Sequence, residues 1–98
     1  MKDLPKFKPR PHDYVLKFAK ETLTKGETTY FHNLTTHQDG HYRVTFDAAY
    51  FGDQEPTKSQ WSTLKKRMKR HNDQVFVFKE HGMTGDGHYY VDFGFFAD

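Results

Sequence analysis

The sequence contains no cysteine among its 98 residues. This absence excludes a disulfide scaffold, a thiolate metal site and a cysteine nucleophile. No hydrophobic run approaches the ~18 apolar residues that a membrane-spanning helix requires, and no apolar signal segment follows Met1. We therefore expect a cytoplasmic protein with no membrane partner.

Aromatic side chains, in contrast, are plentiful. Ten Phe, six Tyr and one Trp make up 17% of the chain. These side chains supply large apolar surfaces for a core, which argues against disorder throughout. On length alone we expect residues 1–98 to form a single domain.

Positive charge is concentrated in short segments, although the net charge is only +2. Residues 1–10 carry four bases and one acid, and residues 56–71 carry six bases and no acid. A near-neutral total with one such stretch produces a local positive field. The stretch suits either a solvated helix face or a surface that binds phosphate groups or an acidic partner.

An eight-residue motif occurs twice in the chain, at an offset of 47 residues. Residues 39–46 read DGHYRVTF and residues 86–93 read DGHYYVDF, with six of eight positions identical. The same offset aligns an aromatic residue in each expected helix. One offset shared by several elements indicates two copies of one unit, and such a pairing would let the matching histidines His41 and His88 approach each other.

The first copy is expected to form a helix followed by two strands. Asp13 is the candidate N-cap of the helix, and Gly26 suits the left-handed conformation at its end. Strands are predicted over 28–34 and 41–48, because these stretches are rich in Thr, Tyr and Phe or alternate in polarity. Asp39-Gly40 forms the turn between them, since this dipeptide accommodates positive φ.

The second copy repeats this plan. A helix is predicted over 56–71, with Thr57 as its N-cap and Gln60 completing a capping box. Strands are predicted over 74–80 and 88–96, separated by a glycine-rich turn.

The order αββαββ predicts an α+β fold, a two-layer sandwich in which a mostly antiparallel four-stranded sheet carries both helices on one face. This tandem α-β-β repeat resembles, in element order, a circularly permuted ferredoxin-like plan. We expect an extended basic arm over 1–10, a first unit over 11–49 and a second unit over 56–96. The arm is extended because each X-Pro pair disfavours helix.

Alternation along the strands assigns the sheet residues to two faces. The helices are expected to cover Tyr42, Val44, Phe46, Phe76, Phe78, Tyr89, Val91, Phe93 and Phe95. The other face, here called the open face, is expected to carry Tyr30, His32, His41, Arg43, Val75, Val77, Lys79, His88 and Tyr90. Such a face is a candidate binding platform because flat rings stack on bases and cations meet phosphates. Ordinary cross-strand pairs or a homodimer contact are the alternatives.

The helix over 56–71 supplies a second candidate surface, since cations one helical turn apart can follow a phosphate backbone. The candidate contact residues of the two surfaces are Lys58, Lys65, Lys66, Lys69, Arg70, Tyr30, Arg43, Tyr90 and Lys79. The helices and the open face lie on opposite sides of the expected sheet. A partner that uses both surfaces must therefore wrap around an edge.

Seven histidines raise the question of a metal site. No H-E-x-x-H, paired Cys-His or His-carboxylate signature is present. The second copy has Lys79 and Thr84 where the first has His32 and His37, so the set is not repeated. No nucleophile stands at a recognisable spacing from a base. We expect no metal, no cofactor and no enzyme activity.

Two functions fit these observations. The first, which we favour, is a small nucleic-acid-binding accessory protein that contacts DNA or RNA through the basic helix and the open face. The second is a small phage-type inhibitor or adaptor without catalytic activity, for example an anti-defence or anti-CRISPR protein. Such a protein would bind a nucleic-acid-processing protein complex of its host.

Overall fold

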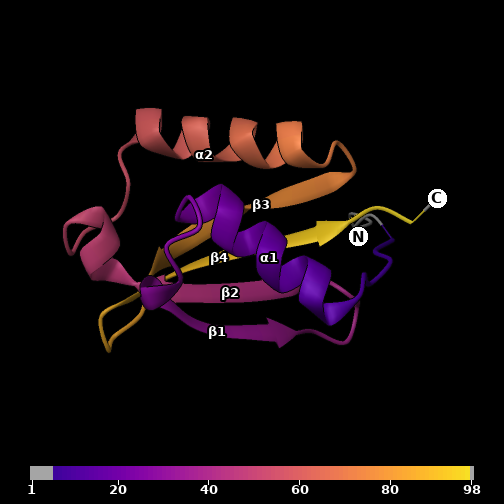
Figure 1. Ribbon diagram of the computed structural model, residues 1–98, viewed down its shortest axis with the longest axis horizontal. Coiled ribbons are helices and arrows are strands. Elements are labelled where there is room, and N and C mark those ends of the chain that lie inside the picture. The colour runs from indigo at the N-terminus through magenta and orange to yellow at the C-terminus, as the bar shows by residue number, and fades with distance from the viewer. Residues whose placement is uncertain (1–5, 98) are drawn as a thin grey trace.

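Two helices cover one face of a four-stranded antiparallel sheet in the computed structural model, which describes residues 6–97 (Figure 1). The helices are α1 (His12–Leu23) and α2 (Lys58–His71). The strands are β1 (Phe31–Thr36), β2 (Tyr42–Asp47), β3 (Val75–Met83) and β4 (His88–Phe95), in the spatial order β1-β2-β4-β3. The predicted α+β fold is confirmed.

The two helices begin in different ways. At α2, the Thr57 hydroxyl accepts from the backbone N–H of Gln60 (3.2 Å), and the Gln60 side chain accepts from the N–H of Thr57 (2.9 Å). This capping box is the predicted one, and such a cap contributes about 1 kcal/mol. At α1, Pro11 occupies the N-cap position, so the prediction of Asp13 as N-cap was wrong. Asp13 lies in the first turn, where its negative charge favours the positive end of the helix dipole.

One continuous core lies between the helices and the sheet. The helices contribute Val15, Phe18, Ala19, Leu23, Trp61, Leu64 and Met68. The two central strands contribute Tyr42, Val44, Phe46, Tyr89, Val91, Phe93 and Phe95. The predicted helix-covered face is therefore confirmed for β2 and β4, whose alternation is regular.

The predicted faces of β3 were wrong. Val75 is buried at 1% exposure and pairs with Phe95, and Val77 packs against the core. Since directly paired residues share a face of the sheet, Phe76 and Phe78 lie on the open face instead. The first four residues of β3, residues 75–78, are all apolar. Alternation between polar and apolar residues therefore could not distinguish the two faces of the sheet here.

The open face gains an apolar cover from the N-terminal segment. Phe7 forms an isolated antiparallel bridge with Phe96, beyond the end of β4. Its ring centroid lies 5.9 Å from that of Phe76 and 5.8 Å from that of Phe78, and the ring lies directly over Gly94. We call Phe7, Phe76 and Phe78 the Phe7 cluster. The described part of the predicted arm thus lies along the sheet, and residues 1–5 of that arm lie outside the described residues.

A short turn replaces the first part of the predicted strand over 28–34. Residues Thr28–Tyr30 form a 3-10 turn, η1, and β1 begins at Phe31. A second such turn, η2 (Ala48–Phe51), follows β2, and the Asp47 side chain caps it by accepting from Ala49 N–H (3.0 Å). Tyr30 packs against Tyr50 of η2, with ring centroids 5.0 Å apart. The expectation that Tyr30 lies on the open face was therefore wrong.

Candidate functional site

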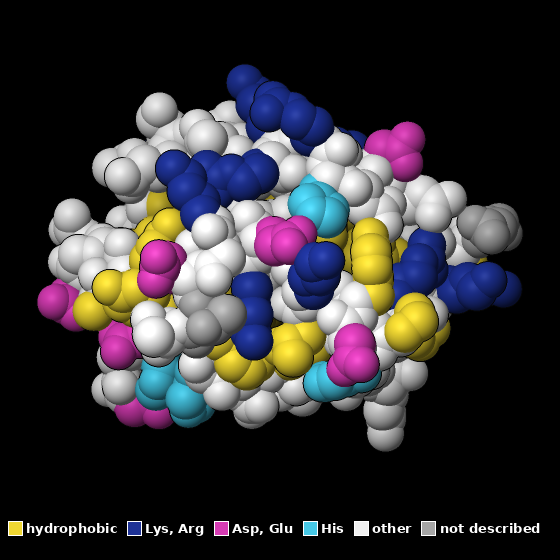
Figure 2. All heavy atoms as spheres, viewed as in Figure 1, with side chains coloured by type: hydrophobic (Ala, Val, Ile, Leu, Met, Phe, Trp, Pro, Cys, Tyr) yellow, Lys and Arg dark blue, Asp and Glu magenta, His cyan; other side chains and the backbone are white. Residues whose placement is uncertain are grey.

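The cationic side chains of α2 lie at the surface, and we call them the α2 cations: Lys58, Lys65, Lys66, Arg67, Lys69 and Arg70. All are exposed except Arg67, which is half-buried. Within residues 6–97, none of them forms an ion pair with a carboxylate. Figure 2 shows Lys and Arg side chains gathered at the top of the view, where α2 lies. The positive field expected from the sequence is thus not compensated locally.

Arg67 has a structural role that sets it apart from the other α2 cations. Its Nη1 donates to the backbone oxygen of Thr22, at 2.8 Å. This bond ties α2 to α1 and satisfies a carbonyl near the end of α1, where the helix leaves its last carbonyls without partners. Arg67 was not among the predicted contact residues.

Three predicted contact residues border the free edge of the sheet. Lys65, Lys66 and Lys69 line a shallow hollow of about 350 Å³ together with Val75, Phe76 and Val77. Strand β3 is an edge strand, and Figure 1 shows α2 beside it. The Lys69 ammonium donates to the backbone oxygens of Asp73 and Val75, both at 3.3 Å, which holds it at this edge.

The position of Phe76 connects the two candidate surfaces. Its ring belongs to the Phe7 cluster on the open face, and the residue also lines the hollow beside the lysines of α2. The basic helix and the open face therefore meet at the β3 edge. Sequence reasoning missed Phe76 as a site residue because it placed the ring under the helices.

Arg43 and Tyr90 lie together on the open face, as predicted. The Arg43 guanidinium donates to both Asp92 carboxylate oxygens, at 2.7 and 2.9 Å, and lies 4.3 Å from the centroid of the Tyr90 ring. These hydrogen bonds to Asp92 raise the pKa of Arg43. Asp92 therefore neutralises the charge of Arg43, whereas the lysines of α2 have no carboxylate partner within residues 6–97. The signal available in the sequence was Asp92 itself, an acid within an otherwise aromatic and apolar strand.

Two further predicted residues stand apart from both groups. Tyr30 packs on Tyr50 at the end of the sheet, as described above. Lys79 is exposed in β3, where the pairing with β4 shifts between Val77 and His81. Neither residue is brought beside the α2 cations by a recorded contact among the described residues.

Four histidines form two stacked pairs on the open face. The rings of His37 and His41 are 4.2 Å apart and almost parallel, and those of His32 and His88 are 3.8 Å apart. His88 pairs with Asp47, at the opposite end of the β2–β4 ladder from the turn that carries His41. The expectation that His41 and His88 approach each other was therefore wrong, because antiparallel pairing separates the two turns.

Each pair is held by the aspartate of its Asp-Gly-His turn. Asp39 contacts His41 Nδ1, and Asp86 lies 3.0 Å from His88 Nδ1. Hydrogen bonds from Thr84 and His88 lower the pKa of Asp86 to about 2. For Asp39, burial acts to raise the pKa, but hydrogen bonds from the His41 backbone and ring outweigh it and lower the pKa. Both aspartates are therefore ionised at neutral pH.

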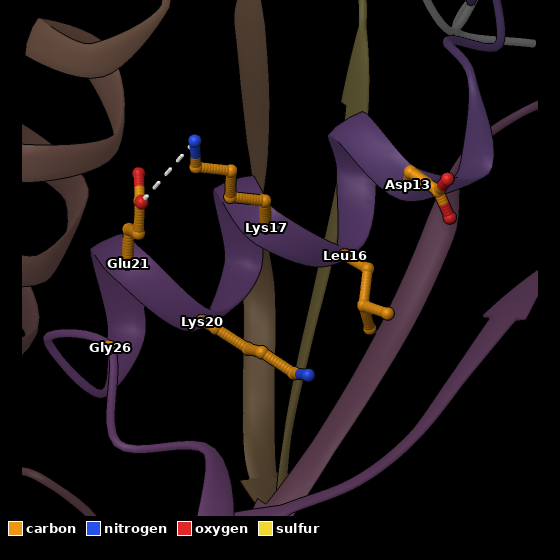
Figure 3. Close-up of a pocket in the computed structure, with 6 residues that line it drawn as sticks. All are labelled: Asp13, Leu16, Lys17, Lys20, Glu21 and Gly26. Carbon is orange, nitrogen blue, oxygen red and sulfur yellow. Dashed lines mark ion pairs between the residues drawn. The ribbon is translucent and has the colours of Figure 1, made fainter.

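A second hollow lies along the outer side of α1, and its lining residues do not form a catalytic group. It measures about 360 Å³ and is lined by Asp13, Leu16, Lys17, Lys20, Glu21 and Gly26. Lys17 and Glu21 form an ion pair at 4.0 Å, and Figure 3 shows Leu16 and Lys20 pointing away from it. No nucleophile, base and oxyanion donor meet there, so the hollow does not resemble an active site.

No helix in the described part of the chain is long and apolar enough to cross a membrane. No protein-family model, no curated protein and no solved structure matches the chain.

Proposed function

We propose that this protein binds single-stranded nucleic acid along the shallow hollow between α2 and the free edge of β3. The observation that carries the proposal is the set of α2 cations, none of which has a carboxylate partner within residues 6–97. The proposed role is that of a cytoplasmic accessory protein without catalytic activity.

The arrangement of the lysines suits a row of phosphates. Lys65 and Lys69 are one helical turn apart, so their Cβ atoms are about 5–6 Å apart on one face of α2. Like charges at this spacing repel by a few tenths of a kcal/mol per pair. A bound polyanion removes this repulsion and releases the counterions of its own phosphates, which drives binding at low salt.

The aromatic rings at the same edge favour a single strand over a duplex. Phe76 lines the hollow beside the lysines and is half-buried, so part of its ring is accessible. An unpaired base can stack on such a ring, and a stacked base contributes about 1–3 kcal/mol. The bases of a duplex are already paired and stacked, so a duplex would use only the cations.

Fluorescence anisotropy with labelled single-stranded DNA, single-stranded RNA and duplex DNA tests the proposal. We expect binding at low salt that weakens as salt rises, with a slope of about −0.7 per phosphate contacted by single strands. Phe76→Leu should weaken single-strand binding about tenfold and leave duplex binding nearly unchanged. Absence of binding to all three probes at low salt would overturn the proposal.

A matched pair of double variants distinguishes binding by the α2 cations from the effect of net charge alone. Lys66→Gln/Arg70→Gln removes two exposed α2 cations and should flatten the salt slope by about 1.4. Lys17→Gln/Lys25→Gln removes the same charge from two exposed positions, one in α1 and one just after it, and should leave the slope unchanged. Equal effects of the two variants would show that net charge alone is responsible.

The Phe7 cluster supports a second candidate function, an inhibitor or adaptor that binds a host protein complex. Its three aromatic residues are half-buried on the open face, which also carries Arg43 and Tyr90. Tyr and Arg are enriched among interface hot spots. In this case Tyr90→Ser should abolish capture of a purified partner complex, whereas Lys66→Gln/Arg70→Gln should leave the capture unchanged.

We also propose that the chain is a tandem αββ repeat with a permuted ferredoxin-like order. The two turns support this interpretation because His37 N–H bonds to His41 O at 2.8 Å and Thr84 N–H bonds to His88 O at 2.7 Å. Exchanging the turn sequence HQDGH for TGDGH, in either direction, tests their equivalence. Both chimeras should fold with a stability within about 1 kcal/mol of the parent, and loss of folding would contradict the interpretation.

A further inference from the structure

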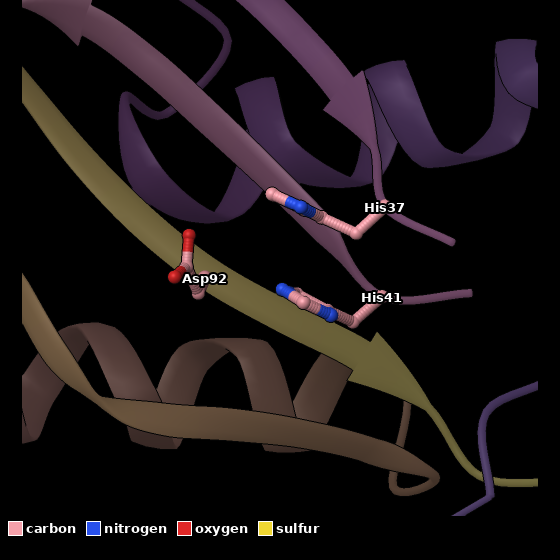
Figure 4. Close-up of side chains that lie close together, drawn as sticks. All are labelled: His37, His41 and Asp92. Atoms are coloured by element: carbon pink, nitrogen blue, oxygen red, sulfur yellow. The ribbon is translucent and has the colours of Figure 1, made fainter. Parts of the chain in front are cut away.

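Three side chains that can ligate a metal converge on the open face. They are His37 and His41, from the first turn, and Asp92, from β4. One ligand atom of each lies within 4.8 Å of the others. Figure 4 shows both imidazole rings extending from the first turn toward the Asp92 carboxylate on β4. Within residues 6–97, no other group of three such residues comes as close together.

The environment of the His37 Nε2 atom also favours a ligand at this cluster. It is buried from solvent and has no hydrogen-bond partner within residues 6–97. A buried polar atom left unpaired costs about 1–3 kcal/mol, so such atoms usually have a partner or a ligand. A metal ion bound at Nε2 would satisfy it.

The second histidine is already oriented for ligation. Asp39 holds the Nδ1 atom of His41, which leaves Nε2 of that ring free to bind. A carboxylate on the outer nitrogen is the usual support of a metal-binding histidine, because it sets the tautomer and the ring orientation. The same aspartate belongs to the turn itself, so the support is built into the hairpin.

We propose that His37, His41 and Asp92 bind a divalent first-row transition metal ion such as Zn²⁺, Co²⁺ or Ni²⁺. Two imidazoles and one carboxylate are the ligand types these ions prefer. Three protein ligands leave a fourth position for water in a tetrahedral site. This site lies apart from the α2 cations and goes beyond the proposed nucleic-acid function.

Small movements bring the three ligands to bonding distance. Atoms 4.8 Å apart have a common centre about 2.8 Å from each, whereas zinc bonds to nitrogen and oxygen are about 2.0–2.2 Å long. Each ligand must therefore move inward by less than about 1 Å. Because the two rings are stacked in parallel, one of them must also tilt so that the nitrogen lone pairs converge.

Arg43 limits how tightly the ion binds. Its guanidinium bonds both Asp92 oxygens, each of which keeps a further lone pair for a metal. The positive charge beside the site opposes the incoming cation. We therefore expect Arg43→Gln to strengthen metal binding, in contrast to variants of the three ligands.

The other histidine pair provides an internal control. His32 and His88 are also stacked, and Asp86 holds His88 Nδ1 at 3.0 Å. They lack a third ligand at the required distance among the described residues. If stacked histidines alone captured metal, both pairs would do so equally.

Calorimetry with Zn²⁺ and visible spectroscopy with Co²⁺ test the proposal on the full chain, prepared without a histidine tag. We expect one ion per chain and the strong visible absorption of four-coordinate Co²⁺. His37→Gln, His41→Gln and Asp92→Asn should each weaken binding at least tenfold. His32→Gln and His88→Gln should leave the affinity within twofold of the wild type.

Imidazole resonances of the wild-type protein provide a measurement that does not depend on variant folding. Zn²⁺ should shift the ring signals of His37 and His41 and leave those of His32 and His88 in place. Absence of binding to the wild type would overturn the proposal. Equal loss in the His32 or His88 variants, or zinc-induced shifts spread over all the histidines, would also overturn it.

Discussion

The two ends of the open face carry the same Asp-Gly-His turn in different surroundings. In both turns the glycine has a positive φ, +94° at Gly40 and +87° at Gly87, and an aspartate holds the Nδ1 atom of the following histidine. At the first turn the Phe7 backbone and side chain press against Gly40, and the Phe7 ring lies 6.0 Å from His41. At the second turn Gly87 faces open space.

This difference decides the chemistry of each end. At the first end the Nε2 atom of His37 is buried and the Asp39 side chain is 42% exposed, whereas the Asp86 side chain at the second end is 72% exposed. The shared Asp-Gly-His sequence therefore produces the same contact between the aspartate and the histidine Nδ1 atom in two different environments. The segment that causes the difference is 33 residues away from Gly40 in the chain, so local pattern contains no sign of it.

Removing the Phe7 side chain, which covers the first turn, should have the largest effect on stability. Phe7→Ala should lower the free energy of unfolding by about 2–3 kcal/mol, somewhat less than a fully buried Phe because the ring is half-buried. Urea denaturation measures this change. A loss below about 0.5 kcal/mol would show that the N-terminal segment adds no stability to the sheet.

The contact between Phe7 and Gly94 can be isolated by a double-mutant cycle. A Cβ atom at Gly94 would lie 2.5 Å from Phe7 Cδ1, so Gly94→Ala must displace the ring. We expect a cost of about 1–3 kcal/mol in the wild type. In the Phe7→Ala background the cost should be near zero. An equal cost in both backgrounds would locate the strain elsewhere in β4.

The ion pair at the centre of the open face should matter next. Arg43→Gln leaves the Asp92 carboxylate, 6% exposed, without its bidentate partner and should cost about 1–2 kcal/mol. The double variant Arg43→Gln/Asp92→Asn should recover part of the loss, since no buried charge is then unpaired. Thermal or urea unfolding measures both. No recovery would indicate that Arg43 acts through its packing on Tyr90 instead.

A histidine on the covered side of the sheet extends the comparison to pH. The His81 ring stacks on the Trp61 ring, with centroids 3.8 Å apart, and the His81 Nδ1 atom lies 2.8 Å from the Tyr89 hydroxyl. Burial lowers the pKa of His81 below 6.5, Glu55 partly offsets this effect, and Lys65 adds to it.

The unfolded chain therefore takes up this proton first as the pH falls below about 6.5. The stability contributed by neutral His81 is present above that pH and is lost as the pH falls toward the folded-state pKa. His81→Gln should show a smaller drop in melting temperature between about pH 7.5 and about pH 5 than the wild type. An identical drop in both proteins would contradict the assignment.

A substitution beside the second turn, which carries His88, should have the smallest effect on stability. His32→Ala removes a ring that is exposed and stacks on His88, and should change the free energy of unfolding by no more than about 0.5 kcal/mol. His37→Ala at the first end is the matched comparison, because its ring is half-buried. A larger cost for His32→Ala than for His37→Ala would reverse the contrast between the two ends.

Local sequence signals predicted much of the fold. The Thr57–Gln60 capping box and the Asp-Gly turns depend on hydrogen bonds between neighbours in the chain. Regular alternation in β2 and β4 placed their core residues correctly. Lys65, Lys66 and Lys69 could be selected as site residues because they lie in a segment without acids.

Tertiary structure decided what the sequence pattern left open. The first residues of β3 are all apolar, so only the pairing of Val75 with Phe95 determined which rings face the helices. The Phe7 cluster and the grouping of His37 and His41 with Asp92 also depend on segments distant in the chain. The physical reason is that hydrogen bonds within a turn need only adjacent residues, whereas burial depends on which remote surface packs against them.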